Sequence, residues 1–372
     1  MTALVLILIV SSTVFSLVLT GVLVRLGNKA GALDSVGFEG HDKTLRAVPN
    51  IGGIAIWAML VLPLAGGLIA MQVAPNAMTS LIPALAPWKT QIAQSAPMAT
   101  AFLICLTVLH VTGCIDDRRP LGALPKTLVL LACALVLVVW FDIRMLESLD
   151  TWLGTESILS IVATVVWIMV LTNAMNYLDN MDGVTAGITV VSGGLFMVAA
   201  LMGSQWFVAA TLALLVGGCL GFLWWNKPTA KIFMGDGGSL VIGFALAVLV
   251  TRVTWFDPEA TTGIGTAWYG VLMPIFVLAL PLYDFSTVTF MRILQGKSPF
   301  KGDQQHFSHR LAERGLGGVG VLVVLLAISC VTGFAGLLLG RSDATQAIFL
   351  AALIGVVMSI VGYLDYTGRK HV

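Results

Sequence analysis

Long apolar runs recur along almost the whole chain, and they constrain its fold more than any other feature. Runs of about 17 to 25 residues are long enough to cross about 30 Å of hydrocarbon as helices. Only 10% of the residues are charged, whereas a soluble domain carries about 25%. The two-residue alternation of a membrane β-barrel is absent from these runs. The sequence therefore predicts an all-α, polytopic membrane helical bundle, with one transmembrane domain over residues 1–372.

We expect about ten or eleven spans. The runs at 184–202 and 207–225 are separated by little more than Gly203, Ser204 and Gln205, so a merged helix is the main alternative there. No Lys or Arg precedes the end of the first run, which therefore resembles a retained span rather than a cleaved signal peptide. The expected spans are 2–24, 51–71, 97–115, 126–141, 156–175, 184–202, 207–225, 238–255, 268–293, 317–340 and 346–366.

The basic residues predict an orientation with the N-terminus outside. Of the twenty Lys and Arg residues, Lys89, Arg144, Arg252 and Arg341 then lie outside, which leaves sixteen on the cytoplasmic side. Polar residues from distant segments share that side, so we expect the active site on the cytoplasmic face. The segments expected to form it are 25–50, 113–126, 173–183, 226–239 and 296–315.

The segment GCIDDRRPLGALPK ends one span with two adjacent carboxylates, Asp116 and Asp117. They repel each other unless a cation or a basic group lies near, and Lys126 follows nine residues after Asp117. Such a pair suits Mg²⁺, an activated acceptor or a general base. The alternative is a solvated loop whose two arginines anchor the membrane edge.

The segment NAMNYLDNMDG places Asn173, Asn176, Asp179 and Asp182 at intervals of three, so a helix would carry them as one slowly drifting stripe. Four polar groups at the end of an apolar span are costly unless they face a cavity or an ion. Capping of the next helix is the alternative, but it explains Asp182 alone.

The stretch FMGDGGS puts Asp236 between glycines at the start of a span, ten residues after Asn226. Glycines let backbone N–H groups approach an anion closely, and a helix N-terminus favours negative charge. Asp236 is then a candidate ligand for a divalent cation that bridges to a phosphate. Capping of the helix by Asp236 or Ser239 is the alternative.

Residues 296–315 gather basic side chains around His306 and His309, which would share one face of a helix. Basic neighbours suit a polyphosphate better than zinc, although a generic anchoring loop is also open. For Asn50, ahead of a glycine pair, a substrate role and an ordinary loop are equally open.

Three intramembrane features remain. His110 is expected to be a hydrogen-bonded structural residue. Asp284 is a costly carboxylate that either pairs with Arg292 or serves the site. Pro274 and Pro281 predict a bend in the span at 268–293, which would open a groove for a lipid.

Four segments in order, GCIDDRRPLGALPK, NAMNYLDNMDG, NKPTAKIFMGDGGS and SPFKGDQQHFSHRL, resemble the signature regions of the polyprenyl-phosphate N-acetylhexosamine-1-phosphate transferases, the glycosyltransferase 4 superfamily of the MraY, WecA and TagO enzymes. The histidine segment is similar to the WecA-type HxHHRL pattern, with Ser308 in place of one histidine. Leu130 and Asn180 also depart from the family pattern. The WecA-like branch is therefore favoured over the MraY branch.

The resemblance implies transfer of a sugar-1-phosphate, N-acetylglucosamine-1-phosphate above all, from a UDP-sugar to undecaprenyl phosphate. UMP leaves, and a lipid-linked glycan for cell-envelope polysaccharide begins. It implies Mg²⁺, with Mn²⁺ as a substitute, held by Asn176 and Asp236. Asp116 and Asp117 would receive or deprotonate the lipid phosphate, with Lys126 as its counter-ion.

The remaining roles also follow from the resemblance. His306 and His309 join the catalytic set, and together with Arg310 they would clamp the donor phosphates or the sugar. Asp179, Asp182 and Asn226 would line the nucleoside pocket, and Asn50 and Asn173 complete the substrate-binding set. The implied setting is the bacterial inner membrane, crossed many times, with lipid around the protein, a homodimer as one option and no nucleic-acid partner.

Two alternatives stay open. An MraY-type phospho-N-acetylmuramoyl-pentapeptide transferase differs only in substrate. A secondary transporter would place its carboxylates near the midplane with repeat symmetry, whereas here most lie at one rim and no repeat is detectable. The sugar, the polyprenol length, the glycan pathway and any general base are not set by the sequence.

Overall fold

The computed structural model describes residues 1–31, 48–253, 268–298 and 305–368, and within them the chain forms helices and no β-strand. The long helices are α1 (Thr2–Ala30), α2 (Gly53–Val73), α4 (Lys89–Asp116), α5 (Ala123–Leu135) with its π-helical continuation η2 (Val136–Trp140), α7 (Ile158–Leu178), α8 (Val184–Met202), α9 (Trp206–Asn226), α10 (Asp236–Val253), α12 (Ala279–Leu294), α14 (Gly318–Leu339) and α15 (Ala344–Gly368). The short helices are α3 (Pro75–Leu81), η1 (Pro83–Trp88), α6 (Glu147–Leu153), η3 (Trp268–Leu272), α11 (Met273–Val277) and α13 (Phe307–Glu313).

The expected number of spans is confirmed. In the part of the chain that the structure describes, ten helices are long and apolar enough to cross a membrane, or eleven if the bent pair α11–α12 counts as one. The helices α8 and α9 are separate, with a turn at Gly203, Ser204 and Gln205, so the merged-helix alternative is wrong. The cytoplasmic placement of the inner loops stays a prediction.

The expected bend at 268–293 is also confirmed. The two helical pieces of this span meet at 66° around Leu278. Pro281 has no N–H to donate to the carbonyl of Val277, and its ring crowds that carbonyl, so a continuous helix is broken there. The lipid groove expected beside the bend stays a prediction.

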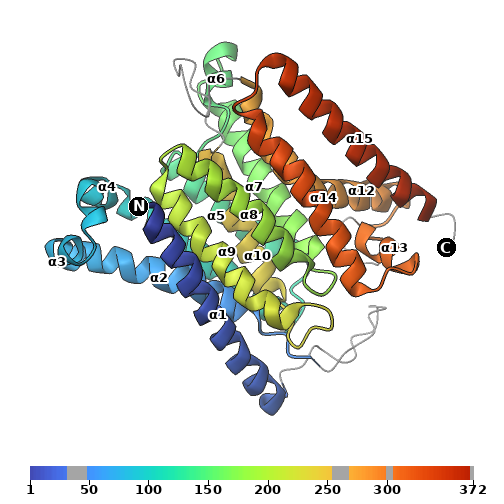
Figure 1. The fold of residues 1–372 in the computed structure, drawn as a ribbon, viewed down its shortest axis with the longest axis horizontal. Coiled ribbons are helices and arrows are strands. Elements are labelled where there is room, and N and C mark those ends of the chain that lie inside the picture. Colours follow the sequence, from blue (N-terminus) through green and yellow to red (C-terminus); the bar gives the residue numbers. More distant parts are fainter. Residues whose placement is uncertain (32–47, 254–267, 299–304, 369–372) are drawn as a thin grey trace.

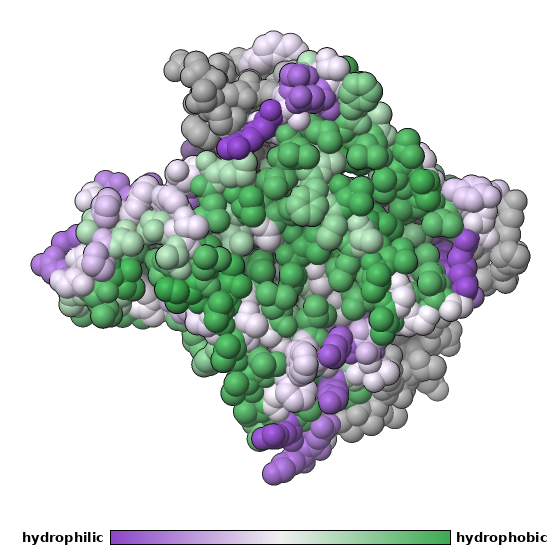
Figure 2. Space-filling view, viewed as in Figure 1, coloured by the Kyte–Doolittle hydropathy of each residue, from purple (hydrophilic) through white to green (hydrophobic). Residues whose placement is uncertain are grey.

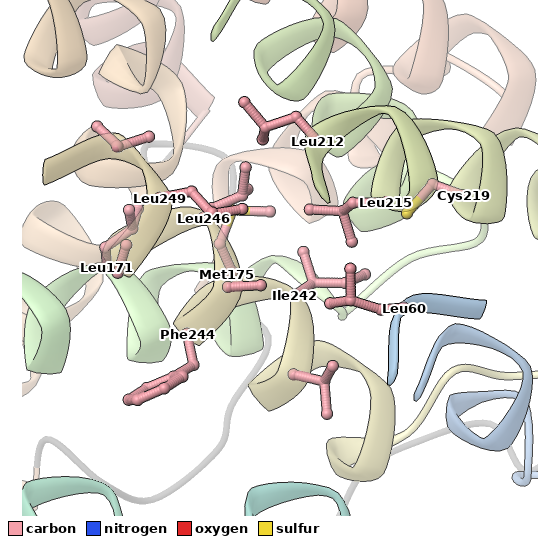
Figure 3. Close-up of a cluster of buried hydrophobic side chains, with 14 of the residues drawn as sticks. Leu60, Leu171, Met175, Leu212, Leu215, Cys219, Ile242, Phe244, Leu246 and Leu249 are labelled. Atoms are coloured by element: carbon pink, nitrogen blue, oxygen red, sulfur yellow. The ribbon is translucent and has the colours of Figure 1, made fainter. Parts of the chain in front are cut away.

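The helix α10 forms the centre of the bundle, and 89% of its 18 residues are buried. It packs against α2, α4, α7, α8 and α9. Its apolar side chains meet those of three neighbouring helices in the core shown in Figure 3. The side chains drawn there include Ile242, Phe244, Leu246 and Leu249 of α10, Leu171 and Met175 of α7, Leu212, Leu215 and Cys219 of α9, and Leu60 of α2.

The outer helices are apolar on their exposed sides. Figure 1 shows α1 lying along α9, whereas α14 and α15 lie beside α12 and α13 on the other side of the molecule. In α1 and in α15, only 17% of the most apolar 18-residue stretch is buried. Figure 2 shows a broad hydrophobic face with hydrophilic side chains gathered at its edges. Many helices expose apolar side chains, as expected for helices in contact with lipid tails.

Small residues let the helices approach closely, as is common between membrane helices. Ser16 of α1 donates a hydrogen bond to the carbonyl of Gly218 in α9, at 2.7 Å. A side chain at Gly53 would meet the backbone of Gly238 at 2.4 Å, and one at Gly113 would meet the backbone of Gly237 at 2.4 Å. The starts of α2 and α10 and the end of α4 are therefore in backbone contact.

Candidate active site

Five helix ends meet at one end of the bundle. They are the C-terminal ends of α4 and α7 and the N-terminal ends of α2, α5 and α10. The connection into α10 is fixed on α2, because the N–H groups of Gly52 and Gly53 donate to the carbonyls of Phe233 and Met234, each at 2.9 Å. Gly235 then turns the chain with a φ of 68°, a value that favours glycine.

Lys126 joins two of the predicted carboxylates. Its Nζ donates to Oδ2 of Asp116 at 2.7 Å and to Oδ2 of Asp236 at 2.8 Å. The other oxygen of Asp116 accepts a hydrogen bond from the N–H of Leu121 at 2.7 Å. Lys126 and Asp236 are 110 residues apart, so the predicted convergence of distant segments is confirmed here.

Asn176 joins the same centre from α7. Its Nδ2 donates to Oδ1 of Asp236 at 2.9 Å and to Oγ of Ser239 at 2.8 Å. The two residues predicted to share a metal, Asn176 and Asp236, are thus in direct contact.

Asp117 has a different environment from its neighbour. The N–H of Asp236 donates to Oδ1 at 2.9 Å, the N–H of Gly237 donates to Oδ2 at 3.2 Å, and Nδ2 of Asn50 donates to Oδ1 at 3.3 Å. Burial, together with the negative charge of Asp236, raises the pKa of Asp117 to about 7, against the lowering by these hydrogen bonds.

This arrangement corrects the interpretation of the glycines around Asp236. We expected the N–H groups at the start of α10 to bind a substrate anion, but those of Asp236 and Gly237 donate to the carboxylate of Asp117. The anion held at this helix N-terminus is therefore a side chain of the protein. The glycines serve close helix contact, because a side chain at Gly237 would lie 2.7 Å from Sγ of Cys114.

The centre fits a hard divalent cation. The ammonium of Lys126 occupies the space between the carboxylates of Asp116 and Asp236, which shows that a positive charge is accommodated there. Among the described residues no three His, Cys, Asp or Glu side chains converge on one point. Mg²⁺ commonly takes one or two carboxylates and completes its shell with water and phosphate oxygens. Asp236 and Asp116 are the candidate ligands. Asn176 presents Nδ2 to Asp236, so it would ligate through its oxygen only with the amide group turned over.

The residues predicted for the nucleoside pocket lie next to this centre, between α7, α8 and α9. Oδ2 of Asp182 accepts a hydrogen bond from the N–H of Ala230 at 3.0 Å. Asn226 is buried, accepts from the N–H of Gly183 at 3.0 Å and donates to the carbonyl of Ile232 at 2.8 Å. These contacts join the loops at 179–183 and 227–235.

Two further members of the polar stripe lie on α7 or at its end. Asn173 donates to the carbonyl of Met169 in its own helix at 2.7 Å, and Asp179 directly follows the last residue of α7. A binding role for the stripe stays a prediction.

The histidine segment forms a second centre beside α7. His306 lies with its ring centre 5.9 Å from that of Tyr177 and 6.2 Å from that of His309. Tyr177 follows Asn176 in α7, so the two centres contact neighbouring residues at the same end of this helix. Residues 299–304, including Lys301 and Asp303 of the expected site segment, lie outside the described residues, as do His41, Lys43 and Arg46 of the segment 25–50.

Asp284 answers the question that the sequence left open. Its Oδ2 lies 2.7 Å from Nδ1 of His306, and its Oδ1 accepts from the N–H of Phe307 at 2.8 Å. The cost of an intramembrane carboxylate marked Asp284 in the sequence, but its partner lies 22 residues away in another element. Arg292 instead stacks over the ring of Tyr177 at 5.1 Å.

Arg310 forms an ion pair that the sequence did not predict. Its Nε is buried against Asp365 of α15, and Tyr283 also donates to Asp365 at 3.1 Å. The ion pair uses only part of the guanidinium, since Nη2 has no hydrogen-bond partner among the described residues. A clamp of Arg310 on the donor phosphates stays a prediction. The only signal for Asp365 in the sequence is a carboxylate near the end of the last span.

Two of the remaining residues are explained by the fold. Nδ1 of His110 lies 2.8 Å from the carbonyl of Gly237, and the ring stacks on Trp57, so its expected structural role is confirmed. Ser308 donates to Oδ1 of Asn180 at 2.7 Å and thereby ties the histidine segment to the end of α7.

Comparison with known proteins agrees with this geometry. The model of glycosyl transferase family 4 matches residues 99–254, which include the centre around Lys126 and Asp236. The chain is 31% identical over 370 residues to a decaprenyl-phosphate N-acetylglucosaminephosphotransferase of Mycobacterium leprae, covering 94% of this chain and 87% of that one. The chain belongs to glycosyl transferase family 4.

Other members of family 4 match over similar lengths. A probable undecaprenyl-phosphate N-acetylglucosaminyl 1-phosphate transferase of Bacillus subtilis is 27% identical, over 93% of this chain and 87% of its own. An undecaprenyl-phosphate alpha-N-acetylglucosaminyl 1-phosphate transferase of Escherichia coli strain K12 is 24% identical, over 91% and 85%. The resemblance seen in four short motifs thus extends over nearly the whole chain.

Proposed function

We propose that this chain transfers N-acetylglucosamine-1-phosphate from UDP-N-acetylglucosamine to a polyprenyl phosphate and releases UMP. The observation that carries the proposal is the contact of Lys126 with both Asp116 and Asp236, three charged groups that two distant signature segments bring to one end of the bundle. Relatives with N-acetylglucosamine phosphate transfer in their names cover most of the chain. The MraY-type muramoyl-pentapeptide donor is the alternative substrate.

The proposed reaction exchanges one phosphorus–oxygen bond for another. An oxygen of the lipid phosphate attacks the β-phosphorus of the UDP-sugar, and the bond from that phosphorus to the bridging oxygen breaks. UMP leaves with the bridging oxygen, and the lipid keeps a pyrophosphoryl sugar. Because the acceptor is already ionised near neutral pH, the protein mainly positions the groups and neutralises their charge.

The residues of the site divide this work. Lys126 balances the negative charges of Asp116 and Asp236 before substrate arrives and can turn toward a phosphate when it does. Asp117 fixes the start of α10 and so holds Asp236 in place. We propose Mg²⁺ at Asp236, Asn176 and Asp116, where it would supply neutralisation of the pyrophosphate charge.

A membrane setting suits this chemistry, because the lipid tail stays in the hydrocarbon while its phosphate meets a soluble donor. The chain is a multi-pass membrane protein by its helices. We propose the bacterial inner membrane, with the site on the cytoplasmic side where the UDP-sugar is available. A secondary transporter is disfavoured because the charged centre lies at helix ends rather than midway along them.

The test is a release assay with purified full-length protein. Protein, Mg²⁺ and decaprenyl or undecaprenyl phosphate are incubated with UDP-N-acetylglucosamine, UDP-N-acetylgalactosamine, UDP-glucose or UDP-muramoyl-pentapeptide, and UMP is measured. UMP from UDP-N-acetylglucosamine, dependent on both lipid and Mg²⁺, is the expected result. UMP only from the pentapeptide donor would replace the proposed substrate, and none from any donor would refute the transferase proposal.

A further inference from the structure

Asp284 is a buried carboxylate inside the bent span, only 1% exposed. Such a group is rare in hydrocarbon and usually serves function or pairs with a named partner. Both of its oxygens are used by consecutive residues of the histidine segment, Oδ2 by Nδ1 of His306 and Oδ1 by the N–H of Phe307. One side chain of α12 therefore fixes both the ring of His306 and the first turn of α13.

The contact between Asp284 and His306 bears on where the imidazole proton lies. An ionised carboxylate only accepts hydrogen bonds, so with Asp284 ionised the 2.7 Å contact places a hydrogen on Nδ1 of His306. The N–H of Phe307 donates to the other oxygen, Oδ1. Nε2 is left as the nitrogen that meets another group, whether the ring is neutral or charged.

His306 packs against α7, the helix that also carries Asn176. Its ring stands edge-on to Tyr177 at 5.9 Å, and the preceding residue of α7, Asn176, contacts Asp236. His306 and Asp236 thus contact neighbouring residues of the same helix, and His306 is only 5% exposed.

We propose that Asp284 is a positioning residue that holds His306 with Nδ1 toward α12 and Nε2 toward the diphosphate or sugar of the bound donor. The identity of the donor rests on the proposed function. Asp284 does not touch substrate; it acts through His306. A carboxylate that orients a histidine in this way commonly contributes 10–100-fold in affinity or activity.

The kinetic test compares Asp284→Asn, His306→Ala and the double variant. An asparagine can keep the acceptor for Phe307 but can also donate to Nδ1, so it no longer fixes the tautomer. We expect kcat of Asp284→Asn to fall about 10–100-fold while KM for the lipid changes little. The double variant should be no slower than His306→Ala, because Asp284 acts only through that ring. Multiplying effects, or a wild-type kcat in Asp284→Asn, would overturn the proposal.

A matched control is Asp150→Asn. Asp150 is another buried carboxylate, but it lies in α6 and accepts from Thr155 at 2.6 Å and from the N–H of Leu159 at 3.1 Å. The control should keep the wild-type kcat. Asp284→Glu, which retains the carboxylate, should recover more activity than Asp284→Asn; the reverse order would contradict the proposal.

A spectroscopic test needs neither activity nor a folded variant of Asp284. The chain has five histidines, so ¹⁵N-histidine labelling and comparison with His306→Ala assign the ring nitrogens of His306. Protonated Nδ1 in the wild type is expected, and a neutral ring with its proton on Nε2 would overturn the proposal. The two proposals can be distinguished. If no donor yields UMP but Nδ1 is protonated, the proposed function is refuted, whereas the positioning of His306 by Asp284 is supported.

Discussion

Asp116 and Asp117 are neighbours in sequence but do different work. Asp116 pairs with Lys126, whereas Asp117 accepts the N–H groups at the start of α10. The positive charge of Lys126 therefore compensates the carboxylates of Asp116 and Asp236. Asp117 instead accepts hydrogen bonds from uncharged N–H groups. Burial and the nearby charge of Asp236 raise the pKa of Asp117 to about 7.

The raised pKa of Asp117 predicts a pH dependence of stability. The folded state binds the proton of Asp117 more tightly than the unfolded state, in which the carboxyl group has its ordinary pKa of 3.8. Stability from this group is thus fully present below the unfolded value and falls as pH rises toward about 7. Without Mg²⁺, the thermal midpoint of the wild type relative to Asp117→Asn should fall between about pH 4 and pH 7. Parallel midpoints of the two proteins over that range would contradict the raised pKa.

Lys126 predicts a large effect of charge removal. Lys126→Gln leaves the carboxylates of Asp116 and Asp236 facing each other without a cation, so turnover should fall at least about 100-fold. Lys89→Gln is the control, because Lys89 is exposed and donates a hydrogen bond to Asn76 of α3, away from the carboxylates. UMP release should be unchanged in the control. Comparable rates for wild type and Lys126→Gln would remove the lysine from the site.

At the scale of elements, the active end depends on how closely α2, α4 and α10 approach. Gly53→Ala should destabilise the protein by about 1–3 kcal/mol, because the new methyl group would lie 2.4 Å from a backbone atom of Gly238. Gly66→Ala in the same helix meets nothing within 4 Å and should be neutral or stabilising. Thermal melting in detergent and UMP release measure both effects. Equal behaviour of the two variants would show that the close contact is unimportant.

The link between α7 and α13 predicts coupling between two residues that both depart from the family pattern. Ser308 donates to Asn180 at 2.7 Å, so the two side chains are in direct contact. Ser308→Ala and Asn180→Ala should each lower kcat/KM, and the double variant should be no worse than either, a coupling of about 0.5–3 kcal/mol. Ser359→Ala, which loses only a bond to Gly355 in its own helix, is the control. Additive losses would indicate independent roles.

Hydropathy predicted the spans well, because span length is a local property. The prolines predicted the bend around Leu278 for the same reason, since the effect of proline on a helix is local. The polar residue types at the active end were also foreseeable, since buried charge is costly in lipid. Their partners were not. The pairs Asp117 with α10, Asp284 with His306, and Arg310 with Asp365 each join segments whose relative rotation is set by helix packing. No local pattern encodes that rotation.

At the scale of the whole molecule, a central helix that is nearly all buried carries the key carboxylate at its first residue. The other nine or ten spans of the described residues surround it, and polar residues at their ends bring Lys126, Asn176 and Asp117 to one place. The bundle thus holds a charged centre at the edge of an apolar body, where a lipid phosphate and a soluble donor can meet.

The most direct test of this account is UMP release by Asp236→Asn, measured with UDP-N-acetylglucosamine, polyprenyl phosphate and Mg²⁺ beside the wild type. Asparagine keeps the size of the side chain and loses its charge, so the melting temperature in detergent should stay close to that of the wild type. The account predicts a rate lower by at least about 100-fold. A wild-type rate in the folded variant would contradict the central role of Asp236 in the transfer.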